Sequence, residues 1–334
     1  MTATHAIRHW GDGVFSVDSG YLRPGFDAIH LLVESDRAAI IDSGTRHSAP
    51  GVLAALDALG IERDHVDWVI LTHVHLDHAG GAGALLQSLP AARLTVHPRG
   101  ARHMSDPGRL WAGTVEVYGR EAAESMYGEV VPVAADRIVQ TGDGARIELA
   151  GRALEFLDTP GHARHHVVIR DGFTGHLFCG DMFGISYREF DVAGRPFAFP
   201  SSTPVQFDPD QMLRSLQRML ALRPEAVYLT HYGQVRDVPR LGALLQRLTQ
   251  LYAELALDAQ RTLGAGSAEA DATAAAASAL QARIEHGMAA LLTGELRAHG
   301  CTMDDARMAQ LLQMDVRLNS AGLIDWLRSR ADAA

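Results

Sequence analysis

Histidine and aspartate residues crowd into one short stretch of the sequence, directly after an apolar segment that is typical of a buried strand. The run that follows this segment, residues 68–71, is Thr72-His73-Val74-His75-Leu76-Asp77-His78. Alternation at a strand end sends His73 and His75 to the same side, and a turn into a helix brings Asp77 and His78 toward them. Imidazole nitrogens and carboxylate oxygens are the ligands that zinc and similar divalent metals prefer. The run therefore predicts a metal site.

Three later positions supply further candidate ligands, each in a loop beside a predicted strand. They are His162 in Thr-Pro-Gly-His, Asp181 in Cys-Gly-Asp and His231 in Leu-Thr-His. Each alone has an ordinary explanation as a turn or surface residue. Their order and placement after the first run favour one shared site. The neighbouring pair His165-His166 is instead interpreted as chance clustering among 17 histidines.

Short apolar or β-branched runs must form the strands that position these residues. The predicted strands are 30–34, 38–42, 68–71, 93–96, 152–157, 167–169, 176–179 and 226–229, with helices at 50–59 and 83–89 between them. Alternating strands and helices indicate a layered α/β architecture, and the two strand-rich halves predict two sheets packed face to face. Gly80 and Gly81 are expected to let the backbone turn tightly where a helix begins.

The last part of the chain has a different pattern. From Pro239 on, strand signals give way to Ala, Leu, Gln, Arg and Glu at helical spacing, with apolar repeats at Leu241, Leu244, Leu245 and Leu248. We therefore predict a catalytic domain over residues 1–238 and a helical subdomain over residues 239–334.

The composition of the chain limits which binding partners and which cellular compartment we expect. The formal net charge of −10 and the absence of a Lys/Arg run disfavour nucleic acid. Two cysteines, Cys179 and Cys301, are too few for a disulfide framework, which favours a reducing, cytoplasmic setting. We find no leader-like segment and no apolar stretch of about 20 residues, so no membrane association is expected. A homodimer stays open.

The ligand run, with the later elements in order, resembles the metallo-β-lactamase superfamily over roughly residues 10 to 235. This resemblance implies an α/β fold, the αββα sandwich, with a C-terminal helical extension here. It also implies that His73, His75 and His162 hold a first metal, that Asp77, His78 and His231 hold a second, and that Asp181 bridges them. Asp42, in Ile-Asp-Ser-Gly, is expected to support the metal loops without binding metal.

Seven ligands for two divalent metals leave coordination positions open, as in catalytic sites. We expect zinc, with iron or manganese as alternatives. Two cations lower the pKa of a shared water, so a bridging hydroxide would attack a substrate carbonyl. Asp77 would orient this nucleophile or move its proton. Tyr187 and Tyr232 are further catalytic candidates, as donors to the oxyanion or the leaving group.

Several branches of the superfamily remain as hypotheses. Thioesterases resembling glyoxalase II and lactonases are nearest in motif, which predicts hydrolysis of a small ester, thioester or lactone. Flavodiiron-like oxidoreductases usually carry Glu at the position of His75, so His75 favours hydrolysis, and a diiron oxidoreductase or oxygen-binding protein of the same fold is kept as the first alternative. A nuclease is disfavoured by the charge, and a non-catalytic ligand-binding or regulatory relative is the last alternative.

The aromatic segment over residues 183–207 has two interpretations. It lines a substrate pocket over the metals, which favours a small-molecule substrate with an apolar acyl group, or it packs its rings beneath the C-terminal helices.

Overall fold

The computed structural model describes residues 6–264 and 273–333, which divide into two compact units. The first unit runs up to Thr159 and also contains His165–Asp181 and Leu222–Val238. The second contains Pro160–Arg164, Met182–Ala221 and the chain from Pro239 on. The predicted division into residues 1–238 and 239–334 shares the boundary after Val238. Residues 160–164 and 182–221 group with the helical unit, and the two consecutive domains stay a prediction.

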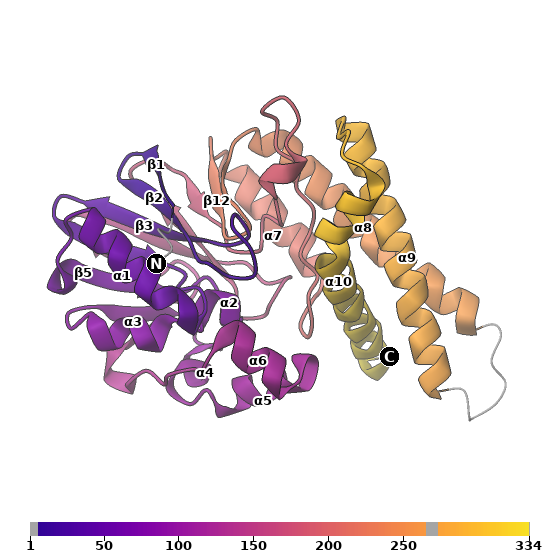
Figure 1. The fold of residues 1–334 in the computed structure, drawn as a ribbon, viewed down its shortest axis with the longest axis horizontal. Helices are drawn as coiled ribbons and strands as arrows, with labels where there is room; N and C mark the ends of the chain where they lie inside the picture. The colour runs from indigo at the N-terminus through magenta and orange to yellow at the C-terminus, as the bar shows by residue number, and fades with distance from the viewer. Residues whose placement is uncertain (1–5, 265–272, 334) are drawn as a thin grey trace. The chain divides into compact units, whose positions relative to one another are not determined.

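The first unit is built on two sheets (Figure 1). The larger has the order β1-β2-β3-β4-β5-β6-β7, and the smaller has the order β13-β12-β11-β10-β9-β8. In the larger sheet the strands are β1 (Ile7–Gly11), β2 (Val14–Asp18), β3 (Ala28–Glu34), β4 (Arg37–Ile41), β5 (Val66–Ile70), β6 (Arg93–Val96) and β7 (Ile138–Gln140). In the smaller they are β8 (Arg146–Leu149), β9 (Arg152–Asp158), β10 (Val167–Asp171), β11 (Leu177–Phe178), β12 (Val227–Leu229) and β13 (Gly233–Val235).

Six helices belong to the described part of the first unit. They are α1 (Ala49–Ala58), α2 (Leu76–Ala79), α3 (Ala82–Ser88), α4 (Ala101–Ser105), α5 (Gly108–Tyr118) and α6 (Arg120–Tyr127). Strand β5 runs parallel to both β4 and β6. Parallel neighbours need a crossover connection, which α1 and α3 provide. Both helices bury apolar side chains in the same cluster as β4, β5 and β6.

The central strands are buried on both faces, which explains why their sequences are continuous runs of apolar residues. On one face of the larger sheet, Ile40 and Val69 pack into the cluster shared with α1 and α3. On the other face, Ile41 and Ile70 share a cluster with Phe156 and other side chains of the smaller sheet. The sheets therefore pack face to face, as predicted.

The second unit contains four long helices, α7 (Pro209–Ala221), α8 (Val238–Gly264), α9 (Thr273–His299) and α10 (Asp305–Ala333), although α8 begins in the first unit's last segment. Four side chains of α9 lie one turn apart and are fully buried: Ile284, Met288, Leu292 and Leu296. This spacing gives one apolar stripe, which the helix must bury against its neighbours. The predicted helical C-terminal extension is thus confirmed for the described residues.

The aromatic rings of residues 183–207 lie in the interior of this second unit. Phe183, Phe190, Phe199 and Tyr187 are fully buried. The hydroxyl of Tyr187 donates to the carboxylate of Asp315, in α10, at 3.0 Å. This contact agrees with the interpretation in which the segment packs beneath the C-terminal helices.

Differences from the predicted elements are concentrated at sheet edges and in one insertion. Strands β1, β2, β7, β8 and β13 were not expected, and each of them is a sheet edge or lies next to one. Helices α4, α5 and α6 occupy an insertion between β6 and β7. Over residues 6–264 and 273–333, no helix combines the length and apolarity that crossing a bilayer requires.

Candidate metal centre

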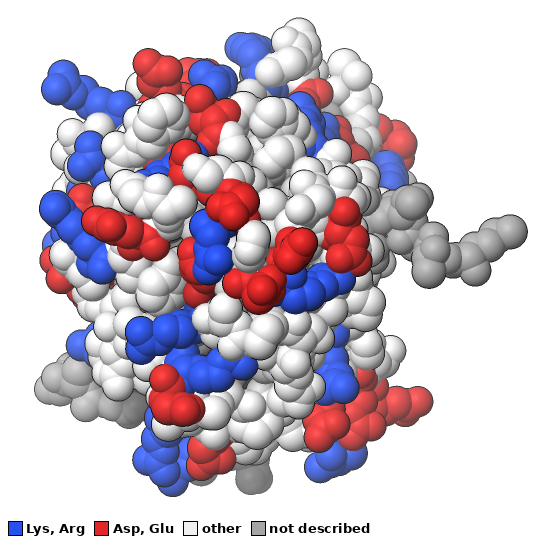
Figure 2. All heavy atoms as spheres, turned by 90° about the vertical axis from the view of Figure 1, so that its left-hand side faces the viewer, with Lys and Arg blue, Asp and Glu red and all other residues white. Residues whose placement is uncertain are grey.

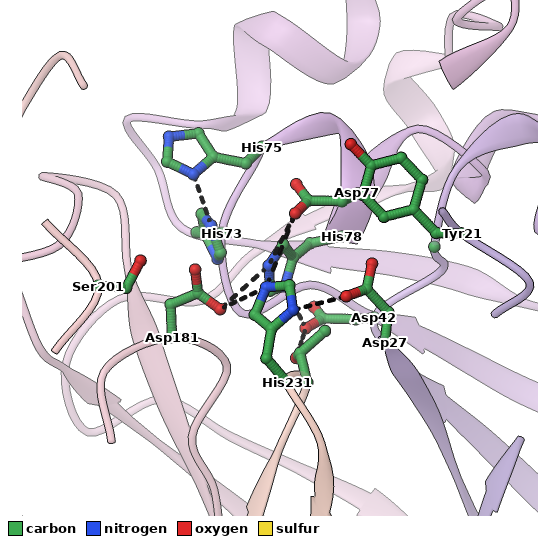
Figure 3. Close-up of polar contacts among 12 residues, drawn as sticks. Tyr21, Asp27, Asp42, His73, His75, Asp77, His78, Asp181, Ser201 and His231 are labelled. Atoms are coloured by element: carbon green, nitrogen blue, oxygen red, sulfur yellow. Dashed lines mark hydrogen bonds and ion pairs between the residues drawn. The ribbon is translucent and has the colours of Figure 1, made fainter. Parts of the chain in front are cut away.

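The ligand run leaves the end of β5 and continues into the short helix α2. His73 and His75 lie on the connection, and His73 Nε2 is 2.9 Å from His75 Nδ1. Asp77 and His78 lie within α2. Strand alternation thus brings His75 against His73, and the helical turn brings Asp77 beside His78 (Figure 3).

Asp181 and His231 reach the same point from the smaller sheet. Asp181 follows β11, and His231 lies in the turn between β12 and β13. Asp181 Oδ1 is 3.2 Å from His78 Nε2 and 3.4 Å from His231 Nε2. Asp77 Oδ2 lies 3.9 Å from His78 Nε2 and 3.7 Å from His231 Nε2. Figure 3 shows these groups pointing toward one another.

These side chains form two overlapping groups that could hold metal ions within the first unit. One group is His73, His78 and Asp181, and the other is Asp77, His78 and His231. In each group the candidate ligand atoms all lie within 4.8 Å of one another. Most of these side chains are buried, but the side chain of Asp77 is 21% exposed. Asp77 is therefore the carboxylate of this cluster that solvent reaches most readily.

His162 belongs to the second unit. It is buried, and its Nδ1 lies 3.1 Å from the carbonyl oxygen of Ser201. When Nδ1 donates to that carbonyl, Nε2 keeps a lone pair for a ligand. Its place beside His73 and His75 stays a prediction. Tyr232 is half-buried, and its catalytic role likewise stays a prediction.

Asp42 supports the ligand loops, as expected. The backbone turns there with a φ of 55°, and the carboxylate is buried. It accepts hydrogen bonds from Thr72 N at 2.8 Å, His78 Nδ1 at 2.7 Å and Thr230 Oγ1 at 3.0 Å. A carboxylate accepts but does not donate, so His78 carries its hydrogen on Nδ1. The lone pair on Nε2 is then directed at the ligand cluster.

A second carboxylate, which the sequence analysis missed, stands behind His231. Asp27 Oδ1 lies 2.5 Å from His231 Nδ1, and Asp27 is only 1% exposed. His231 is therefore oriented as His78 is, with Nε2 toward Asp77 and Asp181. Asp27 lies just before β3, far from His231 in the sequence, and no local pattern marks it.

His166 was wrongly attributed to chance clustering. It is fully buried, its Nε2 accepts a hydrogen bond from Asp181 N at 3.3 Å, and its Nδ1 lies 3.1 Å from Thr159 Oγ1. It therefore holds the backbone of Asp181 in place. Only the fold reveals this role, because Asp181 follows a different strand.

The two glycines after α2 have another function than the one expected. Their φ angles, −61° for Gly80 and −84° for Gly81, suit any residue. A Cβ on Gly81 would instead lie 2.4 Å from the carbonyl oxygen of Ser43, and one on Gly80 would lie 2.4 Å from that of Leu76. Gly81 therefore allows the close approach of α2 to the Asp42 loop, whereas Gly80 avoids a clash with the first residue of α2 itself.

The electrostatics of the cluster favour cations. Burial lowers the pKa of His78. The nearby carboxylates of Asp181, Asp42 and Asp77 raise it by more than burial lowers it, so the pKa of His78 lies well above its ordinary value. Burial also opposes protonation of His231, yet Asp27 and Asp181 raise its pKa to about 10. Burial raises the pKa of Asp27 to about 6 although His231 opposes this.

One buried atom gives a further test of whether metal ions fit here. His78 Nε2 is buried and makes no hydrogen bond with the part of the chain that the structure describes. A set of imidazole nitrogens with carboxylate oxygens suits borderline divalent metals. An ion at this point would satisfy both that lone pair and the surrounding negative charge.

Comparison with known proteins agrees with this geometry. The family model described as the metallo-beta-lactamase superfamily matches residues 22–231. A metallo-beta-lactamase fold-containing protein of Sulfurisphaera tokodaii is 27% identical over 67% of this chain and 79% of its own length. A hydroxyacylglutathione hydrolase of Stenotrophomonas maltophilia is 29% identical over 58% of this chain, which spans only 56% of that hydrolase.

The fold extends over nearly all of a solved structure. A metallo-beta-lactamase family protein from Thermus thermophilus has a TM-score of 0.62 at 20% identity, covering 96% of this chain and 94% of the other. The matched family model covers the strands from β3 to β12, the ligand run and the last candidate ligand. Its extent shows that the chain belongs to the metallo-beta-lactamase superfamily, with the sandwich fold of that family and additional C-terminal helices.

Proposed function

We propose that the protein is a hydrolase with a dinuclear metal site that acts on a small ester, thioester or lactone. The observation that carries this proposal is the position of Asp181. One of its oxygens lies within 3.4 Å of both His78 Nε2 and His231 Nε2. Asp181 also lies in one candidate ligand group with His73, the ligand predicted for the first ion, so its carboxylate is suited to bridge the two ions.

We assign the first ion to His73, His75 and His162 and the second to Asp77, His78 and His231. Zinc suits this nitrogen-rich donor set, with iron or manganese as alternatives. When bound, two such ions supply a water of lowered pKa and polarise a carbonyl.

Asp77 is the residue we propose to move the proton. Its side chain is 21% exposed, compared with 5% for Asp181, and it faces both His78 and His231. A carboxylate with access to solvent at the edge of a metal cluster can accept a proton from water and pass it on. We propose no catalytic role for Tyr187, because its hydroxyl donates a hydrogen bond to Asp315 inside the second unit. Tyr232 stays as a candidate donor.

Thioesters are the substrate class that the relatives favour. Several similar proteins are named hydroxyacylglutathione hydrolases, at 29–30% identity. His75 supports hydrolysis as well, since the flavodiiron-like branch usually has Glu at this position. A lactone or a simple ester uses the same attack on a carbonyl, so all three classes belong in the substrate test.

Aromatic side chains beside His231 support an apolar acyl group. Phe26 meets the ring of His231 edge-on, with ring centroids 5.4 Å apart. Tyr21 lies next to Phe26, and the Tyr21 hydroxyl donates to that of Tyr127, in α6, at 2.9 Å. We therefore base the proposed preference for an apolar acyl group on these aromatic residues, and no longer on residues 183–207.

Surface charge supports a small molecule over nucleic acid as the partner. Figure 2 shows acidic and basic side chains interspersed over one face of the molecule, without a continuous basic band. Ion pairs such as Arg37 with Asp67 and Arg63 with Asp57 also neutralise part of the basic charge of the first unit. Cytoplasmic location rests on Cys179 and Cys301, which are buried free thiols, and it stays a prediction, as does a homodimer.

A substrate panel tests this function. Metal-loaded protein is assayed with thioesters, lactones and simple esters of increasing acyl length, and a chelator should abolish turnover. Asp181→Asn should lose activity and metal, whereas Asp136→Asn, a change at an exposed site, should keep both. Oxygen consumption by the reduced iron-loaded protein, with no metal-dependent turnover of any carbonyl substrate, would favour the oxidoreductase instead.

A further inference from the structure

Backbone hydrogen bonds fix Asp27 next to the turn that carries His231. The carbonyl oxygen of Asp27 accepts from Ser19 N at 2.9 Å. The following residue, Ala28, begins β3, and its N–H donates to the carbonyl oxygen of Thr230 at 2.7 Å. This last bond joins the start of β3 directly to the residue before His231. The position of the Asp27 side chain is therefore set by the sandwich itself and not by an adaptable surface loop.

The side chain of Asp27 is committed to His231. Its Oδ1 lies 2.5 Å from His231 Nδ1, which also lies 3.3 Å from the carbonyl oxygen of Phe26. Beyond the ion pair with His231, neither carboxylate oxygen of Asp27 accepts a hydrogen bond from any residue that the structure describes. Burying a carboxylate costs free energy unless it is paired, so a carboxylate with this single ionic contact indicates a dedicated role.

The contact repeats the arrangement of Asp42 and His78. In both pairs a buried carboxylate oxygen lies within 2.7 Å of Nδ1 while Nε2 faces Asp181. A carboxylate in this position fixes the tautomer and ring orientation of a ligating histidine and increases its basicity. Figure 3 shows Asp27 and Asp42 on one side of the two imidazoles and Asp181 on the other.

We propose that Asp27 is a positioning residue that holds the hydrogen of His231 on Nδ1 and thereby sets the affinity of the Asp77–His78–His231 cluster for its metal ion. The inference rests on the dinuclear site proposed above. It predicts that loss of the carboxylate weakens one of the two ions and leaves the other bound. An Asn amide at residue 27 can turn its NH₂ group to His231 and select the opposite tautomer, which removes the lone pair from Nε2.

A cobalt titration tests this role. Metal-free wild-type protein and the Asp27→Asn variant are titrated with Co²⁺ against a competing chelator, and the visible absorption of bound Co²⁺ is recorded. We expect one of the two dissociation constants to rise by about 10- to 100-fold in the variant, with the absorption of that ion changed. The second dissociation constant should stay the same.

Ser16→Ala is the matched control. Ser16 Oγ lies 2.9 Å from Nδ1 of His30, and both residues are buried, but His30 belongs to none of the candidate metal groups. This variant should lose stability without a change in either Co²⁺ affinity. If Asp27→Asn binds both ions as the wild type does, or weakens them only as Ser16→Ala does, Asp27 has no positioning role. Failure of wild-type protein to bind a second ion would overturn the dinuclear site as well.

A measurement on the unmodified protein covers the case in which Asp27→Asn does not fold. In ¹⁵N-labelled, Zn²⁺-loaded wild-type protein, the His231 ring should show a protonated Nδ1 and an unprotonated Nε2. A proton on Nε2 of the loaded protein would contradict the proposal without any substitution.

Discussion

Replacing Asp42 by Asn should damage the metal site by changing the tautomer of one histidine. Asp42 Oδ2 accepts from His78 Nδ1 at 2.7 Å and from Thr230 Oγ1 at 3.0 Å, while Oδ1 accepts from Thr72 N. Asn retains one oxygen, which can still serve Thr72. Its NH₂ group would then face His78 and draw a lone pair to Nδ1, so the hydrogen moves to Nε2.

The magnitude follows from the bonds that are lost. A hydrogen bond to a charged group contributes about 1.5–3 kcal/mol, so losing the charged acceptor of both His78 and Thr230 should cost about 3–6 kcal/mol of unfolding free energy. Metal affinity at the His78 site should fall at least as far as the 10- to 100-fold that is typical when the carboxylate behind a ligating histidine is lost. The φ of 55° adds little strain, because Asn tolerates this region.

Urea unfolding of the metal-free protein and metal analysis of the loaded protein measure the two effects separately. Thr230→Val is the control, since it removes a single donor to Asp42 and leaves His78 untouched. Thr230→Val should lower the free energy of unfolding by about 1–3 kcal/mol, and the variant should still bind both metal ions. An Asp42→Asn variant that binds two ions per chain with wild-type affinity would refute the reasoning.

Three further predictions concern other parts of the structure. Arg152 pairs with Asp171 in the interior, and although burial raises the pKa of Asp171, the bonds from Arg152 outweigh it and leave that pKa below its ordinary value. Asp171→Asn should therefore lower the free energy of unfolding by about 3–5 kcal/mol at neutral pH. Urea unfolding should show this difference between variant and wild type shrink as the pH falls through and below about 3.9, because the wild-type carboxyl then becomes protonated. Tyr187→Phe should lower the melting temperature by removing the donor to Asp315 but leave kcat unchanged, and a large loss of kcat would restore the catalytic role predicted from sequence. Gly180→Ala should reduce the metal content, because a Cβ there would lie 2.7 Å from the His166 ring nitrogen and displace the neighbouring Asp181; unchanged metal content would contradict this.

Local periodicity explains what the sequence predicted well. The His73 to His78 run follows a strand and enters a helix, so a period of two and then one helical turn suffices to bring its side chains together. The bounds of the central strands were predicted to within two residues, because both faces are buried and few polar residues interrupt them. Edge strands such as β1, whose residues are largely exposed, lack that signal.

Contacts between elements distant in the sequence explain the rest. Asp27 meets His231 because the start of β3 is bonded to the turn after β12, which depends on the packing of two sheets. His166 supports Asp181 across two different strands. Gly81 is required by the approach of the Ser43 carbonyl, not by its own φ. Spacing along the chain carries none of this information.

Anomalous diffraction from crystals of the Zn²⁺-loaded protein tests the central claim most directly. We expect two peaks about 3.5–4 Å apart, the separation usual for two-metal sites. One peak should be bonded by Asp77, His78 and His231, and the other should lie among the remaining histidines of the set, with Asp181 in contact with both. A single peak at full loading, or a second peak held by other residues, would contradict the dinuclear site and the hydrolytic function built on it.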